Sequence, residues 1–148
     1  MAKLFNSAFE ISLRIMLLLS ASGAEGMTID RISAYDFITI YSRVFGLSET
    51  SLHGNNDFGF SEFATRRNLI QNALKSLVLG GMVYVLRKDD GFHYSINNNG
   101  KALCNNLTVE YATAYSVLAK KVMEKYDPIN EVELLSVINK ESTKALRR

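Results

Sequence analysis

The region between residues 61 and 100 constrains the fold of this chain more than any other region. Residues 61–79 carry apolar side chains at helical spacing, and two consecutive glycines follow them as a helix stop. The strand-like runs 83–86 and 92–96 then flank a turn with an Asp-Gly pair, which suits a tight hairpin. A new helical pattern starts at Asn98. The sequence therefore predicts a helix, a two-stranded ribbon and another helix, in that order.

This order is typical of a winged helix, a variant of the helix-turn-helix units that bind DNA or other proteins. We therefore predict a mainly α (α+β) fold, with a two-stranded wing and extra C-terminal helices. The 148 residues suffice for one sizeable core and are too few for two. Residues 1–100 are expected to form a winged-helix domain that includes an N-terminal helix. Residues 101–148 would add a long helix and a C-terminal docking helix, packed on the same core.

The N-terminal helix is expected to start near Ser7, because Ser7 and Glu10 fit a capping box. It carries two apolar stripes, one with Phe9, Leu13, Met16 and Leu17, the other with Ile11, Ile15 and Leu18. Two interpretations remain open: a core helix buried on both sides, or a helix with one stripe facing a partner subunit.

The remaining boundaries follow from capping and breaking residues. Thr28 and Ile29 are interpreted as a short edge strand, and Asp30 as the cap of a second helix that reaches about Phe45. One helix is expected from Asn98 to Tyr126. A last amphipathic helix would start at Asn130 and Glu133, and the basic tail 140–148 is expected to fray.

The outer face of the predicted helix 61–79 carries side chains of the types that contact phosphates and base edges in DNA-binding proteins. The candidate nucleic-acid contacts are Arg66, Arg67, Asn68, Gln71 and Lys75, with Arg87 and Lys88 from the hairpin turn. A solvated helix face explains the same residues equally well. Asp89 and Asp90 beside the turn would weaken any phosphate contact, and the net charge of +2 does not by itself predict DNA binding.

No pattern of residues predicts catalysis, a metal site or a cofactor. Phosphate-binding loops, dinucleotide fingerprints and hydrolase motifs do not occur, and His53 and His93 have no neighbouring cluster of ligands. The single cysteine, Cys104, excludes a disulfide framework and indicates a reduced, cytoplasmic protein. The apolar run 15–19 is too short for a signal peptide or a membrane span. The loop 46–59, which contains His53, has no assigned role.

Several blocks of sequence resemble a known family. They are Leu4 to Arg14 (the pattern F-N-S-x-x-E-I-x-L-R), Tyr35-Asp36-Phe37, Ser51-Leu52-His53, and Arg66 to Ile70 continuing through Leu77 to Val83. Over residues 4–126 the chain resembles the middle component of the prokaryotic ABC-three-component systems. That group includes the small subunit of Lamassu defence complexes.

The resemblance implies a non-catalytic adaptor. Such a subunit would bridge an ATPase of the structural-maintenance-of-chromosomes (SMC) type and an effector, commonly a nuclease, and would help to restrain the effector until DNA is sensed. The resemblance implies no membrane, no small-molecule substrate and at most a non-specific DNA contact through the complex. The predicted partner-binding residues are Phe5, Ile11, Arg14, Ile15, Leu18, Val132, Leu135 and Ile138.

A second function remains open at this point. The same helix pattern suits a stand-alone winged-helix transcription regulator that dimerises and reads the major groove through Asn68, Gln71 and Asn72. The regulator predicts salt-sensitive binding to a particular duplex, whereas the adaptor predicts dependence on a protein partner.

Overall fold

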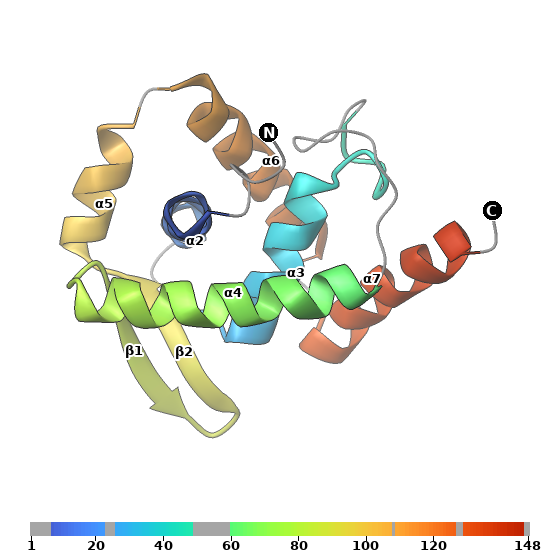
Figure 1. Cartoon of the computed structure of the whole chain (residues 1–148), viewed down its shortest axis with the longest axis horizontal. Coiled ribbons are helices and arrows are strands. Elements are labelled where there is room, and N and C mark those ends of the chain that lie inside the picture. The colour runs from blue at the N-terminus through green and yellow to red at the C-terminus, as the bar shows by residue number, and fades with distance from the viewer. Residues whose placement is uncertain (1–6, 23–25, 49–59, 108, 127–128, 147–148) are drawn as a thin grey trace.

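The computed structural model describes residues 7–22, 26–48, 60–107, 109–126 and 129–146. Within these ranges the chain is mainly helical, with one two-stranded antiparallel sheet, as the sequence predicted (Figure 1). The elements are α2 (Ala8–Ala21), α3 (Ile29–Ile40), α4 (Phe60–Leu79), β1 (Val83–Lys88), β2 (Gly91–Ile96), α5 (Asn98–Asn105), α6 (Glu110–Tyr126) and α7 (Glu131–Leu146). No helix in the described ranges combines the length and apolar character that a membrane crossing requires.

Helix α2 lies in the middle of the fold. Figure 1 shows it end-on, with α4 below it, α3 beside it and the α5–α6 segment arching around its other side. Both of its apolar stripes are buried: Ile11, Ile15 and Leu18 on one stripe, and Leu13 and Met16 on the other. The helix is therefore a core helix. Its predicted partner stripe faces the chain's own helices, and Phe9 at its start is exposed.

Side-chain caps define where the helices start. The Ser7 hydroxyl accepts the Glu10 backbone N–H at 3.1 Å, which confirms the predicted cap of α2. The cap of α3 is Thr28, whose hydroxyl accepts the Arg31 N–H at 3.3 Å, and not Asp30 as predicted. Asn130 caps α7 as predicted, because its side chain accepts the Glu133 N–H at 2.9 Å.

Two predicted boundaries of the second helix are wrong. No strand forms at Thr28 and Ile29; the pairing residue is Met27, which forms an isolated bridge with Tyr94 of β2. The helix α3 ends at Ile40 rather than near Phe45, because Tyr41 leaves the helical conformation and residues 41–46 form turns.

The predicted hairpin forms, but Arg87, Lys88 and Gly91, which were predicted in the turn, belong to the strands. Strands β1 and β2 pair from Val83 with Ile96 to Lys88 with Gly91, around a two-residue turn at 89–90. Gly91 has φ +122°, a conformation that other residues rarely adopt. Gly81, at φ +76°, ends α4 and supplies the left-handed stop that the two glycines predicted.

The predicted long helix from Asn98 to Tyr126 is two helices. The chain leaves α5 after Asn105, and the backbone N–H of Leu107 bonds the carbonyl of Cys104 at 3.0 Å, a tight closing turn. Consecutive asparagines favour such an end, because their side chains compete with the helical backbone. The break lets α5 pack beside β2 while α6 packs on α2 and α3.

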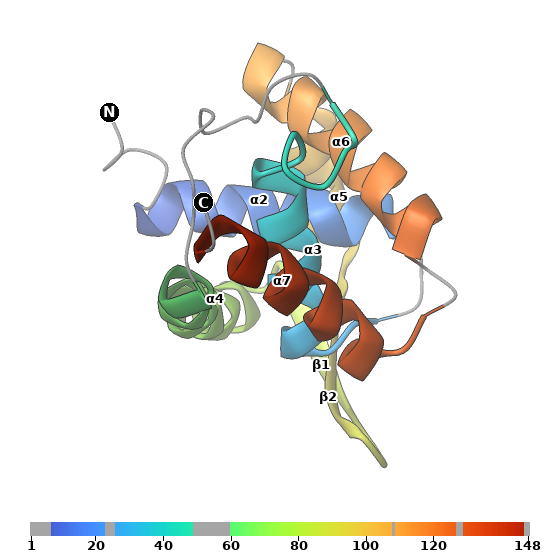
Figure 2. The ribbon, with the colours of Figure 1, turned by 90° about the vertical axis from the view of Figure 1, so that its right-hand side faces the viewer.

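Helix α7 packs across α3 and α4, as Figure 2 shows. Leu134 and Ile138 are buried in this contact. The Thr28 hydroxyl bonds Glu131, and Arg31 donates to the Ile129 carbonyl at 2.9 Å. The helix continues to Leu146, so the expectation that the chain frays from Lys140 is wrong.

Candidate functional site

A buried cluster of charged and phenolic side chains joins three helices. Arg14 of α2 donates from Nε to Asp36 Oδ1 at 3.0 Å and from Nη2 to Oδ2 at 3.5 Å. The hydroxyl of Tyr115 on α6 donates to the same Asp36 Oδ1 at 2.6 Å. All three side chains are at most 2% exposed. The Asp36 carboxylate on α3 is therefore the shared acceptor of a core ion pair and a hydrogen bond.

The ionisation of this cluster is set by burial and by its neighbours. Burial alone would raise the pKa of Asp36, but the charge of Arg14 and the hydrogen bonds from Tyr115 and Arg14 hold that pKa below its usual value. Burial would also lower the pKa of Arg14, and Asp36 more than reverses this. Burial and the nearby carboxylate raise the pKa of Tyr115. Tyr111 has a pKa of about 12, mainly because of burial.

Arg66 extends the cluster to α4. Its side chain is 6% exposed, its guanidinium lies 5.9 Å from the centre of the Tyr41 ring, and its charge contributes to the low pKa of Asp36. Three helices thus contribute charge to one buried site, and α6 contributes the neutral Tyr115 hydroxyl. The predicted nucleic-acid contact at Arg66 is wrong, because a guanidinium packed into the core cannot reach a phosphate outside.

The arrangement is suited to holding helices together. An aspartate held ionised between arginines is a weak base, and a tyrosine with a raised pKa stays protonated as a donor. Removing one member would leave an uncompensated charge in the core, which proteins tolerate poorly. The cluster therefore ties α2, α3 and α6 together in a fixed arrangement, with α4 packed beside them.

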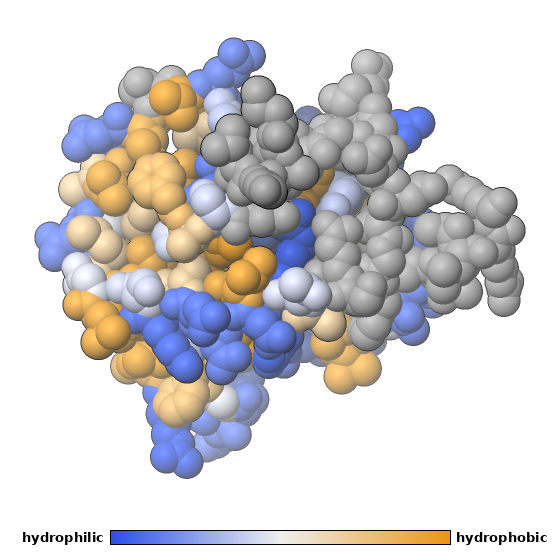
Figure 3. All heavy atoms as spheres, viewed as in Figure 1, coloured by the Kyte–Doolittle hydropathy of each residue, from blue (hydrophilic) through white to orange (hydrophobic). Residues whose placement is uncertain are grey.

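The outer face of α4 carries the rest of the predicted nucleic-acid set. Asn68, Gln71 and Lys75 are exposed, as are Arg87 and Lys88 on the hairpin. In Figure 3, hydrophilic side chains cover the exposed side of α4 and the tip of the hairpin. These predicted residues therefore lie on the surface, where contact with another molecule is open to them.

Arg67 is part of this surface but has a partner. Its Nε lies 2.7 Å from Asp30 Oδ1, in a pair whose side chains are each more than a third exposed. The pair links α4 to the start of α3. It offsets the charge of the one guanidinium on the outer face of α4.

The structure divides the predicted partner-binding residues. Ile11, Arg14, Ile15, Leu18 and Ile138 are buried in the chain's own core, so these five predictions are corrected: the side chains have no surface to offer. Leu135 is half-buried, and Phe5 lies outside the described residues. Val132 is 78% exposed on the outer side of α7 and remains available to a partner.

Neither described titratable candidate has the surroundings of a reactive centre. His93 Nε2 lies 2.7 Å from Asp90 Oδ1, and its Nδ1 lies 3.3 Å from the Gly26 carbonyl, so its interactions are with the hairpin turn and the adjoining backbone. Burial raises the pKa of the Cys104 thiol, which weakens it as a nucleophile. His53 lies outside the described residues, and the described residues contain no cluster of metal-ligating side chains.

Sequence reasoning missed two features of the surface and core. Nothing local in the sequence marks the hydrogen bond from Tyr115 to Asp36. The exposed apolar side chains along the hairpin, Tyr84, Val85, Leu86 and Phe92, were interpreted only as strand formers. Four apolar residues on one small hairpin are more than its buried face requires, and this excess was the sequence signal for a contact surface.

Comparison with known proteins places the chain in a family. The chain belongs to the ABC-three component (ABC-3C) system Middle Component 2 family, whose sequence model it matches over residues 4–148. A middle component implies partner components in a complex. No curated protein and no solved structure gives a significant match. Arg14, Asp36 and Arg66, which belong to three of the sequence blocks that predicted this family, meet in the buried cluster.

Proposed function

We propose that this chain is a non-catalytic adaptor subunit of a prokaryotic defence complex of the Lamassu type. It would bridge an SMC-like ABC ATPase and an effector, a nuclease, and would help to restrain the effector until foreign DNA is sensed. The observation that carries the proposal is the family match, because it extends across every described element from α2 to α7.

The order of elements supports a winged-helix core for this adaptor. Met27 pairs with β2 between α2 and α3, and the β1–β2 hairpin directly follows α4. A winged helix has this order: a helix, a short pairing segment, two helices and a two-stranded wing. Under the proposal this core presents α4, the hairpin and α7 to other subunits.

A structural role, rather than catalysis, fits the chemistry of the core. Asp36, Arg14 and Tyr115 satisfy one another inside the protein. The cluster stabilises a rigid body, and a rigid body suits a subunit that transmits the position of one partner to another.

Helix α7 is the proposed partner contact among the residues that the sequence suggested. Leu134 and Ile138 hold one side of the helix against α3 and α4, while Val132 points outward. An exposed apolar residue on a helix that is firmly docked on its other side suits a contact with a partner.

The proposal is tested by purifying the tagged chain from its native host, with nuclease treatment of half the sample. Recovery of a large coiled-coil ATPase and an effector in both halves is the expected result. Val132→Asp should weaken this recovery, whereas Val117→Asp, at an exposed valine on α6, is the matched control. Recovery of the chain alone would contradict the adaptor.

One observation favours the regulator as a second candidate. Asn68, Gln71 and Asn72 are exposed on α4, the position of a recognition helix in a winged helix. The regulator predicts a dimer that binds a particular duplex with strong salt dependence, and loss of sequence preference in Gln71→Ala. The burial of Arg66 and the pairing of Arg67 with Asp30 leave Lys75 as the exposed cation of this face, which suits the regulator less well.

A further inference from the structure

The outer edge of strand β1 has backbone groups that point away from its partner strand. The Tyr94 N–H donates to the Met27 carbonyl at 2.8 Å, and the Met27 N–H donates to the Tyr94 carbonyl at 3.0 Å. Both backbone groups of Tyr94 therefore face away from β1. Its partner across the hairpin is Val85. Residues opposite each other in an antiparallel ladder share one type of pair, so the N–H and carbonyl of Val85 also face outward. Arg87, two residues further on, has the same orientation.

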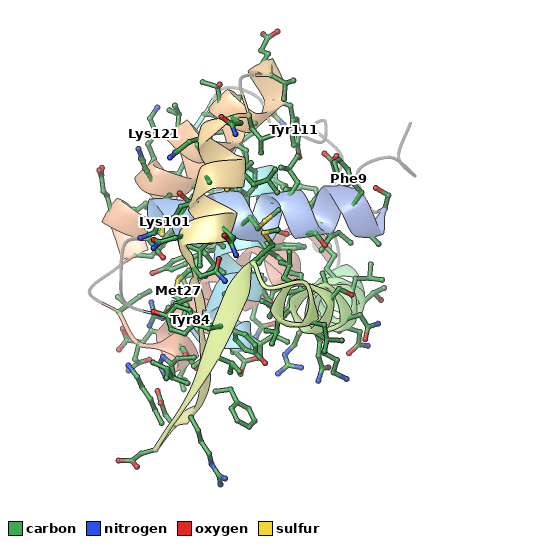
Figure 4. The ribbon with its side chains drawn as sticks, turned by 90° about the vertical axis from the view of Figure 1, so that its left-hand side faces the viewer. Phe9, Met27, Tyr84, Lys101, Tyr111 and Lys121 are labelled. Carbon is green, nitrogen blue, oxygen red and sulfur yellow. The ribbon has the colours of Figure 1, made fainter. Side chains whose placement is uncertain are left out.

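This edge is open within the described part of the chain. The sheet there consists of β1 and β2, and the added bridge at Met27 lies on the β2 side. Figure 4 shows β1 on the near side of the hairpin, with Tyr84 along it and Lys101 of α5 on the same side of the molecule. An unpaired edge of this kind is a template for a further strand.

The side chains of β1 favour coverage of this edge. Tyr84, Val85 and Leu86 are three consecutive exposed apolar residues, and Phe92 is exposed on β2. Because neighbours along a strand point to opposite faces, apolar surface is exposed on both faces beside the open edge. Edge strands of stand-alone proteins usually carry charges or breaks that prevent pairing, and the middle of this strand carries neither.

The charges around the edge indicate what covers it. Between residues 63 and 109 the only acidic residues in the sequence are Asp89 and Asp90, and Asp90 bonds His93 at 2.7 Å. The exposed cations of the same stretch are Lys75, Arg87, Lys88 and Lys101. A second copy of this chain would bring the same positive charge to the contact, whereas an acidic segment would complement it.

We propose that the outer edge of β1 binds an extended segment of a partner protein in which apolar and acidic side chains alternate. The segment adds a third strand to the sheet through the backbone groups of Val85 and Arg87. Its apolar side chains cover Tyr84 and Leu86 on one face of the sheet, and its acidic side chains lie on the other face, where they pair with Arg87. This assigns a surface and a partner chemistry that the adaptor role leaves undefined.

Two synthetic peptides test the edge directly. One alternates valine with glutamate over eight residues, and the other has lysine in place of each glutamate. Titration of the purified full chain, followed by amide NMR, should show the acid peptide slowing hydrogen exchange at Val85 and Arg87. The affinity of the lysine peptide should be lower than that of the acidic peptide by a factor of about ten or more. Equal binding of the two peptides, or no binding of the acidic one, overturns the proposal.

A proline substitution separates the edge from the hairpin itself. The Val85 N–H faces away from β2, so Val85→Pro removes the donor for an added strand and no bond between β1 and β2. We expect Val85→Pro to weaken acidic-peptide binding about tenfold or more, since a backbone bond is lost at the centre of the contact. Val85→Thr keeps the N–H and is the matched control. Unchanged binding by Val85→Pro, with the hairpin intact by NMR, overturns the proposal.

The edge and the adaptor role can fail separately. If the tagged wild-type chain recovers no ATPase, the adaptor role fails while the peptide result stands. If the complex forms and the Val85 amide exchanges equally fast in the free chain and in the complex, the edge is not the contact and this proposal fails. Dimerisation of the chain that Val85→Pro abolishes would assign the edge to a second copy and would also overturn it.

Discussion

Arg66 and Arg67 are neighbours in the sequence and have opposite roles in the structure. Arg66 is buried over the Tyr41 ring beside the Arg14–Asp36–Tyr115 cluster, whereas Arg67 lies on the surface and pairs with Asp30. Successive residues on a helix point about 100° apart, so one enters the core while the other reaches solvent. The comparison teaches that the position of a charge relative to the core, more than its type, decides what it contributes to stability.

The buried side of this comparison is tested most strongly by Asp36→Ala. The substitution leaves the Arg14 guanidinium in the core without its carboxylate. We expect it to lower the free energy of unfolding by about 3–5 kcal/mol, measured by urea denaturation. Asp36→Asn keeps the shape and an acceptor for Tyr115, so it separates loss of charge from loss of volume. A loss below about 1 kcal/mol, the range of surface pairs, would place the cluster in the same class as Arg67–Asp30.

Tyr115→Phe tests the hydrogen bond within the cluster. It removes the donor that lies 2.6 Å from Asp36 Oδ1 and keeps the ring packed. Hydrogen bonds to charged groups contribute about 1.5–3 kcal/mol, so a loss of that size in the free energy of unfolding is expected. Tyr126→Phe, at a buried tyrosine about three turns further along the same helix, is the comparison variant. A neutral Tyr115→Phe would mean that Arg14 alone satisfies the carboxylate.

Acid should weaken the cluster in a defined direction. The pKa of Asp36 is lower in the folded chain than its usual value, because Arg14 and Tyr115 outweigh the effect of burial. Its contribution to stability is therefore complete above the unfolded pKa of about 4 and is lost as the pH falls through the lower, folded value. Urea denaturation from neutral pH downward should show the stability difference between wild type and Asp36→Asn shrinking in acid. A difference that grows in acid would reverse the assigned shift.

The smallest effect is expected at the exposed ion pair between Arg67 and Asp30. Arg67→Ala removes an ion pair whose side chains are each more than a third exposed, so the free energy of unfolding should fall by about 1 kcal/mol or less. The loss should shrink further in high salt, because solvent screens the pair. Lys75→Ala on the same face controls for the change in net charge. A loss as large as that of Asp36→Ala would remove the distinction drawn between the two arginines.

Local chemistry made much of the fold predictable. The caps at Ser7 and Asn130, the glycine stop of α4 and the tight turn of the hairpin follow from residues close in sequence. The break after Asn105 was missed, because the apolar spacing continues through it while the backbone does not. The cap at Thr28 was missed because aspartate, the type of residue 30, is preferred over threonine at a helix N-terminus.

The candidate site was less predictable than the fold. The sequence marked Arg14, Asp36 and Arg66 through the blocks that resemble the family, but it gave no sign that they meet. It also placed Ile11, Ile15 and Leu18 on a partner surface, and the structure buries them. The open edge of β1 depends on which strands pair with it, and pairing is a property of the whole sheet.

The sequence alone determined the family, the mainly helical composition and the helix–hairpin–helix order, because these depend on local propensity and on spacing along the chain. Only the tertiary structure decided which of two adjacent arginines is buried, which apolar stripe is core, and which strand edge is open. Each of these depends on segments that are distant in sequence. A side chain's exposure is set by what packs over it, and Asp36 meets Arg14 and Tyr115 only when α2, α3 and α6 come together.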